Sequence, residues 1–366
     1  MEGNPQTGES VLLRSAKGAV LGWGAYSPAS QIRVRMWSFQ EDQIPNDEML
    51  HSRIASAVEM RKRLPDARQT DALRLIHSES DQLPGIIADS FGEVVVLHLH
   101  TAGAYHWRDV IHSAIRDVTH CRTLLEVSED EVLKLEGLTP FHDQEGDAVS
   151  NPFLISEHGL KYQIDLSEGQ KTGFYLDQRQ NRLAIRKYSS GGKVLDAFSY
   201  SGGFSMNALM GMASSIDAID SSAAALQLLK SNLDLNGFGE KKQSQIQANV
   251  FEHLRKLRDQ NARYNLIVLD PPKLAPTRAQ AEKAARAYKD LQILALKLLD
   301  SRGILMTFSC SGGVDMSLFK KILMDASLDA NRQVQIIEQL HQAADHPVQP
   351  CFPEGEYLKG LVCVVD

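Results

Sequence analysis

Apolar and polar residues recur at regular intervals through the second half of the chain. Short apolar runs such as Leu266–Leu269 and Ile304–Phe308 are separated by longer segments whose apolar residues lie three or four positions apart. The short runs are typical of strands buried on both faces, and the longer period is typical of amphipathic helices. We therefore expect an α/β fold with a mostly parallel sheet covered on both faces. The predicted helices are 178–189, 204–212, 222–236, 251–260, 279–300 and 316–328, and the predicted strands are 193–198, 215–220, 244–248, 264–269, 303–309, 333–339 and 358–365.

The first half of the chain follows a different pattern. Residues 10–13, 20–24 and 32–37 predict three short strands, which are few for an independent core, so we expect part of a small β-barrel. A small α+β domain should follow, and two apolar runs around His158–Gly159 favour a β-hairpin. The expected helices of the α+β domain are 46–64 and 109–118, and its expected strands are 73–76, 94–100 and 123–127. The predicted domains are 1–42, 43–152 and 153–366.

Composition narrows the class of protein. Of the 366 residues, 43% are hydrophobic and 23% are charged, which is usual for a water-soluble protein. No apolar run approaches the roughly 18 residues of a membrane span, and no secretion signal is visible at the N-terminus. We therefore expect a cytoplasmic protein that does not bind membranes. The four cysteines form no CxxC pair, so neither a disulfide framework nor a metal site is predicted.

The formal net charge of −7 argues against strong non-specific binding of nucleic acids. A local basic patch can nevertheless steer RNA, and one cluster of basic residues is a candidate. A solvated helix face is the more common reason for such a cluster, and contact with RNA is the alternative. The cluster consists of Lys171, Arg179, Arg182, Arg186 and Lys187.

Every candidate site residue in the second half follows a predicted strand. The carboxyl ends of parallel strands meet at one edge of a sheet, where nucleotide-like ligands bind in doubly wound folds. We expect loop 198–203 to bring its glycines and free N–H groups close to such a ligand. Acidic residues at strand ends also cap helices, but five polar strand ends at one edge favour a binding site. In chain order these residues are Asp196, Asp220, Asn249, Asp270 and Cys310.

The spacing of glycines in loop 198–203 limits the kinds of ligand that it can bind. Phe198–Gly203 lacks the GxGxxG spacing of a dinucleotide site, which favours a ligand without phosphates, S-adenosylmethionine. The Asp196 carboxylate suits a sulfonium or ammonium group. Asp220 suits the ribose hydroxyls, and the Asn249 amide suits an adenine edge.

Two strand ends carry the chemistry. A lone cysteine such as Cys310 is most often a small buried hydrophobic group. Its thiolate can also add to C6 of a pyrimidine, which makes C5 nucleophilic enough to take a methyl group. Asp270 can then hydrogen-bond cytosine N3. Amine methyltransferases carry an aromatic residue after a similar Asp-Pro-Pro turn, and Lys273 weakens that interpretation.

Two other functions stay open. One is a non-catalytic RNA-binding or ribosome-assembly module that keeps the same fold. The other is methylation of an amine or of uracil C5 with the same donor. The presence of Asp196, Asp270 and Cys310 together favours an enzyme over the first alternative.

Several strings resemble the ribosomal RNA large subunit methyltransferase I family. They include Lys171–Arg179, Phe198–Phe204, Asp270–Lys273, Thr307–Ser311, Gly24–Arg33, Glu79–Ile86 and Gln342–Pro347. The resemblance covers nearly the whole chain. It implies a partial PUA domain, a central α+β domain and a class I Rossmann-like methyltransferase domain with a seven-stranded sheet.

The resemblance also implies a reaction and its partners. Members of this family make 5-methylcytosine in 23S rRNA, with S-adenosylmethionine and no metal, through a nucleophile that matches Cys310. Contact of the strand Arg33–Arg35 with RNA, and assembly as a homodimer, are further expectations. The residues expected to bind the donor are Tyr175, Gln178, Arg179, Asp196, Phe198, Ser199, Tyr200, Ser201, Gly202, Asp220, Ser221, Asn249, Val250 and Asp270.

Three positions depart from the family pattern. The chain starts inside the PUA domain, which predicts either a start codon upstream of Met1 or weaker RNA docking. Asn249 stands where the family has aspartate, which predicts softer adenine recognition. Residues 127–131 are more acidic than their counterparts, which argues against an RNA role there.

Overall fold

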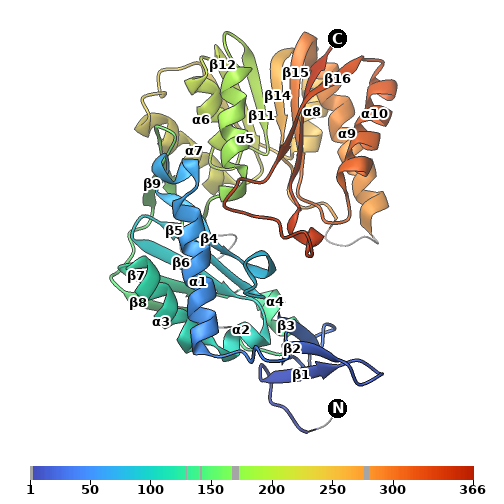
Figure 1. Cartoon of the computed structure of the whole chain (residues 1–366). Helices are drawn as coiled ribbons and strands as arrows, with labels where there is room; N and C mark the ends of the chain where they lie inside the picture. Colours follow the sequence, from blue (N-terminus) through green and yellow to red (C-terminus); the bar gives the residue numbers. More distant parts are fainter. Residues whose placement is uncertain (1–2, 129, 141, 167–172, 276–279) are drawn as a thin grey trace. The chain divides into compact units, whose positions relative to one another are not determined.

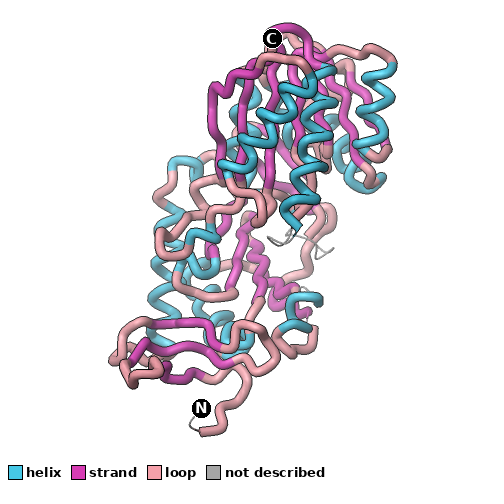
Figure 2. The backbone as a smooth tube through the Cα atoms, turned by 90° about the vertical axis from the view of Figure 1, so that its right-hand side faces the viewer, coloured by secondary structure: helices cyan, strands magenta, loops and turns pink. Residues whose placement is uncertain are grey.

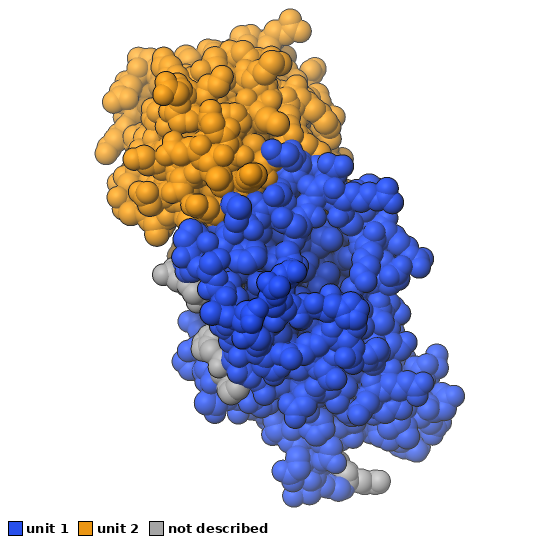
Figure 3. All heavy atoms as spheres, turned by 90° about the vertical axis from the view of Figure 1, so that its left-hand side faces the viewer, with its two compact units in different colours: residues 1–159, 164–176, 344–355 blue, residues 160–163, 177–343, 356–366 orange. Residues whose placement is uncertain are grey.

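The computed structural model describes residues 3–128, 130–140, 142–166, 173–275 and 280–366. The chain divides into two compact units (Figure 3). Unit 1 contains residues 1–159, 164–176 and 344–355, and unit 2 contains residues 160–163, 177–343 and 356–366. Among the described residues, no helix has the length and apolar character needed to cross a membrane. The division into three domains stays a prediction.

Unit 1 contains two sheets (Figure 1). The first is antiparallel and confirms the three predicted strands, β1 (Ser10–Arg14), β2 (Val20–Tyr26) and β3 (Val34–Ser38). The second has the order β4-β5-β6-β7-β8 and consists of β4 (Ala72–His77), β5 (Ile86–Phe91), β6 (Val94–Leu99), β7 (Thr123–Val127) and β8 (His142–Gly146). The helices α1 (Asp47–Lys62) and α3 (Arg108–Thr119) pack against each other and share one core with this sheet. Two shorter helices are α2 (Ala102–His106) and α4 (Asp130–Leu135).

Strands β5 and β8 have no counterpart in the sequence prediction. The charged residue Asp89 interrupts the apolar pattern of β5, although its side chain is fully buried. Its carboxylate accepts hydrogen bonds from Arg74 of β4, at 2.6 and 2.9 Å. Strand β8 is polar throughout and pairs on one side only, with β7. Both strands therefore depend on partners that local periodicity does not reveal.

Unit 2 is organised around one large sheet (Figures 1 and 2). This sheet has seven strands in the order β13-β12-β11-β14-β15-β17-β16. The five strands from β13 to β15 are parallel, and β17 is inserted antiparallel between β15 and β16. The predicted mostly parallel sheet is thus confirmed. The strands are β11 (Lys193–Ala197), β12 (Ser215–Asp220), β13 (Gln243–Gln247), β14 (Tyr264–Leu269), β15 (Leu299–Ser309), β16 (Val334–His341) and β17 (Lys359–Val365).

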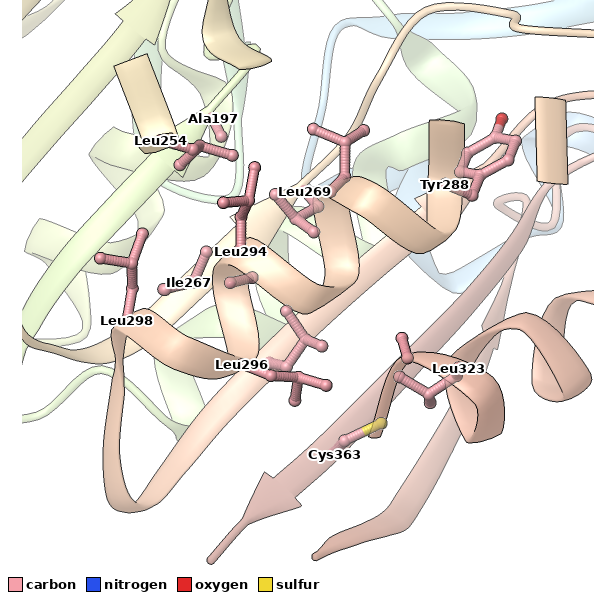
Figure 4. Close-up of a cluster of buried hydrophobic side chains, with 14 of the residues drawn as sticks. Ala197, Leu254, Ile267, Leu269, Tyr288, Leu294, Leu296, Leu298, Leu323 and Cys363 are labelled. Carbon is pink, nitrogen blue, oxygen red and sulfur yellow. The ribbon is translucent and has the colours of Figure 1, made fainter. Parts of the chain in front are cut away.

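Helices cover both faces of this sheet (Figure 1). One layer consists of α5 (Arg179–Ala184), α6 (Gly203–Met210) and α7 (Ala223–Leu235), and the other of α8 (Val250–Asp259), α9 (Ala281–Leu298) and α10 (Met316–Ala330). Leu294 and Leu298 of α9 pack in the same buried cluster as Ile267 and Leu269 of β14 (Figure 4). The predicted helix 178–189 is shorter than expected, because α5 gives way to a 3-10 turn at residue 185. The predicted hairpin is present as β9 (Phe153–Glu157) and β10 (Leu160–Ile164).

Candidate active site

Asp196 is a buried carboxylate near the end of β11, with 1% of its surface exposed. Its Oδ2 accepts hydrogen bonds from the backbone N–H and the hydroxyl of Ser205, at 2.9 and 2.6 Å. Its Oδ1 is buried and has no hydrogen-bond partner within the described residues. Burial raises the pKa of Asp196 to about 6, and the charge of Asp220 adds to this effect, while the bonds from Ser205 oppose it.

The loop after β11 holds three residues in the left-handed region of backbone conformation. The φ angles are +68° at Phe198, +48° at Tyr200 and +85° at Gly202. Only glycine adopts this region without cost, so Phe198 and Tyr200 store backbone strain. Such strain is found mainly at functional sites. Position 202 requires glycine for a second reason, because a Cβ there would lie 2.7 Å from the Leu229 side chain.

The N–H groups of this loop are largely used within the protein. Those of Phe198 and Ser199 both bind the carbonyl oxygen of Ile219, and that of Tyr200 binds Asp220 Oδ2 at 2.9 Å. The N–H groups of Phe198, Ser199 and Tyr200 therefore do not face a ligand, and the expectation for the rest of the loop stays a prediction. The loop instead offers the Ser199 hydroxyl, which is buried and has no partner in the described part of the chain. The neighbouring Ser201 is buried as well.

The ends of β12 and β13 also carry polar side chains. The partly exposed Asp220 carboxylate accepts hydrogen bonds from the N–H groups of Tyr200 and Ser222, each at 2.9 Å, and Ser221 beside it is exposed. Asn249 is the N-cap of α8, where its Oδ1 accepts the N–H of Glu252 at 3.3 Å. This cap leaves the amide nitrogen of the exposed Asn249 as the group that points away from the helix backbone. Val250 follows and is buried.

Asp270, at the end of β14, is surrounded by other acidic groups. Its lost hydration, together with the charges of Asp177 and Asp196, raises the pKa of Asp270 to about 7. A hydrogen bond from the Gln178 side chain and the charge of Arg182 oppose this shift. Gln178 is buried, and its Oε1 accepts from Asn181 at 2.6 Å, which directs its amide N–H groups toward Asp270. These surroundings favour the protonated form of Asp270 more than is usual for an aspartate.

Cys310 follows β15, the strand next to β14, and lies between two buried serines. The Tyr288 hydroxyl contacts the hydroxyls of Ser309 and Ser311, each at 3.0 Å. Burial raises the pKa of Tyr288, and the charges of Cys310 and Asp270 raise it further. Both strand-end groups therefore lie close to this tyrosine. Cys310 itself is partly exposed, so the alternative interpretation as a small buried hydrophobic group is wrong.

Lys359 is a residue that the sequence prediction missed. It lies on β17 opposite Ser309, and only 5% of its surface is exposed. Its Nζ donates hydrogen bonds to the carbonyl oxygens of Ser311, at 2.9 Å, and Tyr357, at 2.6 Å. The available signal was a lysine at the start of an otherwise apolar strand, which predicts a buried charge with a specific partner.

Two of the five residues in the predicted basic cluster do not lie on the surface. Arg179 and Arg182 are buried, with 1% and 3% of their surface exposed. The Arg182 side chain packs against Gly203, where a Cβ would lie 2.6 Å from its Cδ. Arg186 donates to Asn207 Oδ1, and Lys187 lies 3.5 Å from Glu338. Lys171 lies outside the described residues.

Two other predicted contacts have different surroundings from those expected. Tyr175 is 39% exposed and belongs to unit 1, so its role at the donor stays a prediction. Arg35 forms an ion pair with the buried Glu136 at 2.7 Å, and Arg33 donates to the carbonyl of Pro28. The Arg35 guanidinium is therefore committed to the structure of unit 1, and RNA contact through this strand stays a prediction.

The residues of unit 2 fit S-adenosylmethionine. Asp196 Oδ1 and Ser199 Oγ are buried acceptors without protein partners in the described ranges, at the strand ends where such ligands bind. Asp220 and Asn249 follow at the next two strands in the order expected for a ribose and an adenine. No three His, Cys, Asp or Glu side chains among the described residues are arranged to hold a metal ion.

Comparison with known proteins gives two family matches. Residues 145–351 match the family described as S-adenosylmethionine-dependent methyltransferase, and residues 1–39 match a PUA-like domain. Curated relatives cover the whole chain and 92% of their own length. "Ribosomal RNA large subunit methyltransferase I" of Klebsiella pneumoniae (strain 342) is 43% identical, and that of Serratia proteamaculans (strain 568) is 44% identical.

Solved structures show the same fold. The crystal structure of SMU.776 complexed with SAH has a TM-score of 0.86 at 23% identity, covering 98% of this chain and 92% of that one. Trm5b from Pyrococcus abyssi has a TM-score of 0.54 at 15% identity, with 76% and 74% covered. The sequence match, the seven-stranded sheet and the polar residues at its strand ends all indicate a methyltransferase that uses S-adenosylmethionine. The chain belongs to the S-adenosylmethionine-dependent methyltransferases, in the ribosomal RNA large subunit methyltransferase I family.

Proposed function

We propose that this protein methylates C5 of a cytosine in 23S rRNA, through a covalent bond between Cys310 and C6 of the base. The observation that supports this most directly is the adjacency of Cys310 and Asp270. They follow the neighbouring parallel strands β15 and β14, and both raise the pKa of Tyr288. A nucleophile and an acid with a near-neutral pKa at one sheet edge suit attack on a pyrimidine ring.

The donor is expected at the ends of β11, β12 and β13. Bound S-adenosylmethionine supplies an electrophilic methyl group. The buried acceptors of Asp196 and Ser199 suit its amino-acid ammonium group, and Asp220 suits the ribose hydroxyls. The amide of Asn249 and the N–H of Val250 suit the adenine edge. Tyr175, Gln178 and Arg179 complete the proposed site, and Gln178 also orients Asp270.

Cys310 and Asp270 have separate roles in the proposed methylation of cytosine. The Cys310 thiolate adds to C6, and a proton held by Asp270 stabilises the electron density that collects at N3. C5 then takes the methyl group, and the donor leaves as S-adenosylhomocysteine. Transfer of the C5 proton to solvent restores the ring and expels the thiolate, and Asp270 takes back the proton from N3. The target base has to leave its stack to reach these groups.

The substrate class comes from the family. The relatives are named for the large-subunit ribosomal RNA, and residues 1–39 match a PUA-like domain. The net charge of −7 requires local rather than global attraction to RNA. We expect 23S rRNA, naked or partly assembled, as the partner in a cytoplasmic reaction.

The test uses 23S rRNA transcribed without modifications, S-adenosylmethionine and nucleoside mass spectrometry. We expect 5-methylcytosine with the native protein and with Cys351→Ala, an exposed cysteine that serves as the matched control. Cys310→Ala should form none. RNA containing 5-fluorocytosine should trap the native protein, but not Cys310→Ala, as a covalent complex. Full activity of Cys310→Ala contradicts the mechanism, and a methylated amine or uracil contradicts the assigned target.

A further inference from the structure

We propose that Lys359 is a positioning residue for Cys310, whose buried ammonium group fixes the backbone that follows the cysteine and favours the thiolate form. This inference rests on the proposed role of Cys310 as the nucleophile. It adds a residue from β17, the antiparallel strand beside β15, to a site otherwise built from the ends of parallel strands.

Hydrogen bonds give Lys359 a defined position. Its Nζ donates to the carbonyl oxygens of Ser311 and Tyr357, at 2.9 and 2.6 Å, so it ties the turn after Cys310 to the start of β17. The Ser311 hydroxyl is also engaged, because it accepts the N–H groups of Leu274 and Ala275 at 3.1 and 3.0 Å. The residue after the cysteine is therefore anchored through both its carbonyl and its side chain, which limits the positions open to Cys310.

Packing alone does not explain why a charged residue occupies the buried position 359. Burying an ammonium group in a sheet is unfavourable, and burial lowers the pKa of Lys359 to about 8. An apolar residue would suit the strand better, as the following Leu361 and Val362 show. A charge kept at such a cost is more often functional than structural.

Four charged or titratable groups face this ammonium group. Cys310, Asp315 and Glu356 raise the pKa of Lys359, and Lys273 lowers it. Asp315 is engaged as the N-cap of α10, accepting the N–H of Leu318 at 2.7 Å, and Glu356 is exposed. Because a nearby cation stabilises a thiolate, the coupling between Lys359 and Cys310 acts in both directions.

The test measures the thiolate directly. The full-length protein is alkylated with iodoacetamide from pH 5.5 to 9.5, and mass spectrometry follows the Cys310 peptide alone. Lys359→Gln keeps a hydrogen-bond donor but removes the charge, and we expect about tenfold slower alkylation at pH 7 and a midpoint about one pH unit higher. Lys359→Arg should restore most of the native rate. Lys230→Gln, an exposed site on α7, is the matched control and should titrate like the native protein.

A native midpoint in Lys359→Gln overturns the proposal. Near-ultraviolet circular dichroism verifies folding, and Lys359→Met provides a second uncharged variant that should titrate like Lys359→Gln. The assay needs no RNA or donor, so its outcome is separate from that of the methylation test. If Cys310→Ala stays active while Lys359→Gln shifts the thiol, the proposed function fails, and only the electrostatic coupling between Lys359 and Cys310 stands.

Discussion

The Ser311 hydroxyl accepts a hydrogen bond from the backbone N–H of Ala275, with 3.0 Å between oxygen and nitrogen. This contact joins the two loops that carry the proposed acid and nucleophile, because Ala275 belongs to the segment after Asp270 and Ser311 follows Cys310. The N–H of Leu274 binds the same oxygen at 3.1 Å. A single side chain therefore sets the spacing between two strand ends.

Ser311→Ala should reduce stability and slow methyl transfer. The change leaves two backbone N–H groups without their partner, at a cost of about 1–3 kcal/mol in the free energy of unfolding. Urea unfolding and single-turnover methylation measure the two effects. Ser309→Ala is the matched control, since it removes a hydroxyl that bonds to Tyr288 and to the N–H of Ser311 but has no contact with the loop after Asp270. Equal effects of both substitutions on methyl transfer would contradict the role assigned to Ser311.

Asp196→Asn should stabilise the protein at pH 7.5 while abolishing donor binding. The folded carboxyl has a pKa of about 6, above its unfolded value near 3.9, so the folded state binds this proton more tightly. Stability from this group is complete below pH 4 and falls as pH rises through 6. Removing the charge should therefore add about 3 kcal/mol to the free energy of unfolding at pH 7.5. Thermal unfolding and calorimetry with S-adenosylmethionine measure the two outcomes.

Asp217→Asn, on β12, should have the opposite effect on stability to Asp196→Asn. The Asp217 carboxylate accepts from the Tyr264 hydroxyl at 2.7 Å and lies 3.0 Å from Lys193, and these partners hold the pKa of Asp217 low although burial opposes them. Its substitution should destabilise the protein at pH 7.5 and leave donor binding intact. Destabilisation by Asp196→Asn would show that its charge is compensated in the folded state.

The pH dependence of methyl transfer should show the titration of Asp270. At saturating donor, the single-turnover rate should fall as pH rises through about 7, because Asp270 then loses the proton that it offers to N3. Asp270→Asn keeps an N–H donor at every pH, so its profile should lack this decline. Because the rate also depends on the Cys310 thiolate, the measure is the ratio of the native rate to that of Asp270→Asn. A ratio that does not fall between pH 6 and 9 rules out Asp270 as the proton donor.

Arg61→Met should destabilise unit 1 by about 3–5 kcal/mol. Arg61 is fully buried, and its guanidinium donates to both oxygens of Asp81 at 2.7 Å and to the carbonyl of Asp345. The substitution leaves a largely buried carboxylate without its cation. The double variant Arg61→Met/Asp81→Leu should recover part of the loss, as urea unfolding will show. The exposed pair Arg63–Glu59 is the control, and Arg63→Met should cost less than 1 kcal/mol.

The sequence by itself determined the order and type of the elements in unit 2. Strands 215–220 and 264–269 have the predicted bounds, because short, mostly apolar segments that alternate with amphipathic helices are typical of strands in a covered parallel sheet. The same reasoning placed Asp196, Asp220 and Asp270 at one sheet edge, since parallel strands carry their carboxyl ends to the same side. These properties follow from local periodicity and the rules of parallel sheets.

Tertiary structure alone decided how each polar group is used. Arg182 was predicted as part of a surface cluster but is buried against Gly203, and Gln178 hydrogen-bonds Asp270 from a different element. Lys359 reaches the turn after Cys310 only because β17 inserts antiparallel between β15 and β16. Burial and charge coupling depend on which distant segments pack together, and a residue's sequence neighbours do not contain that information.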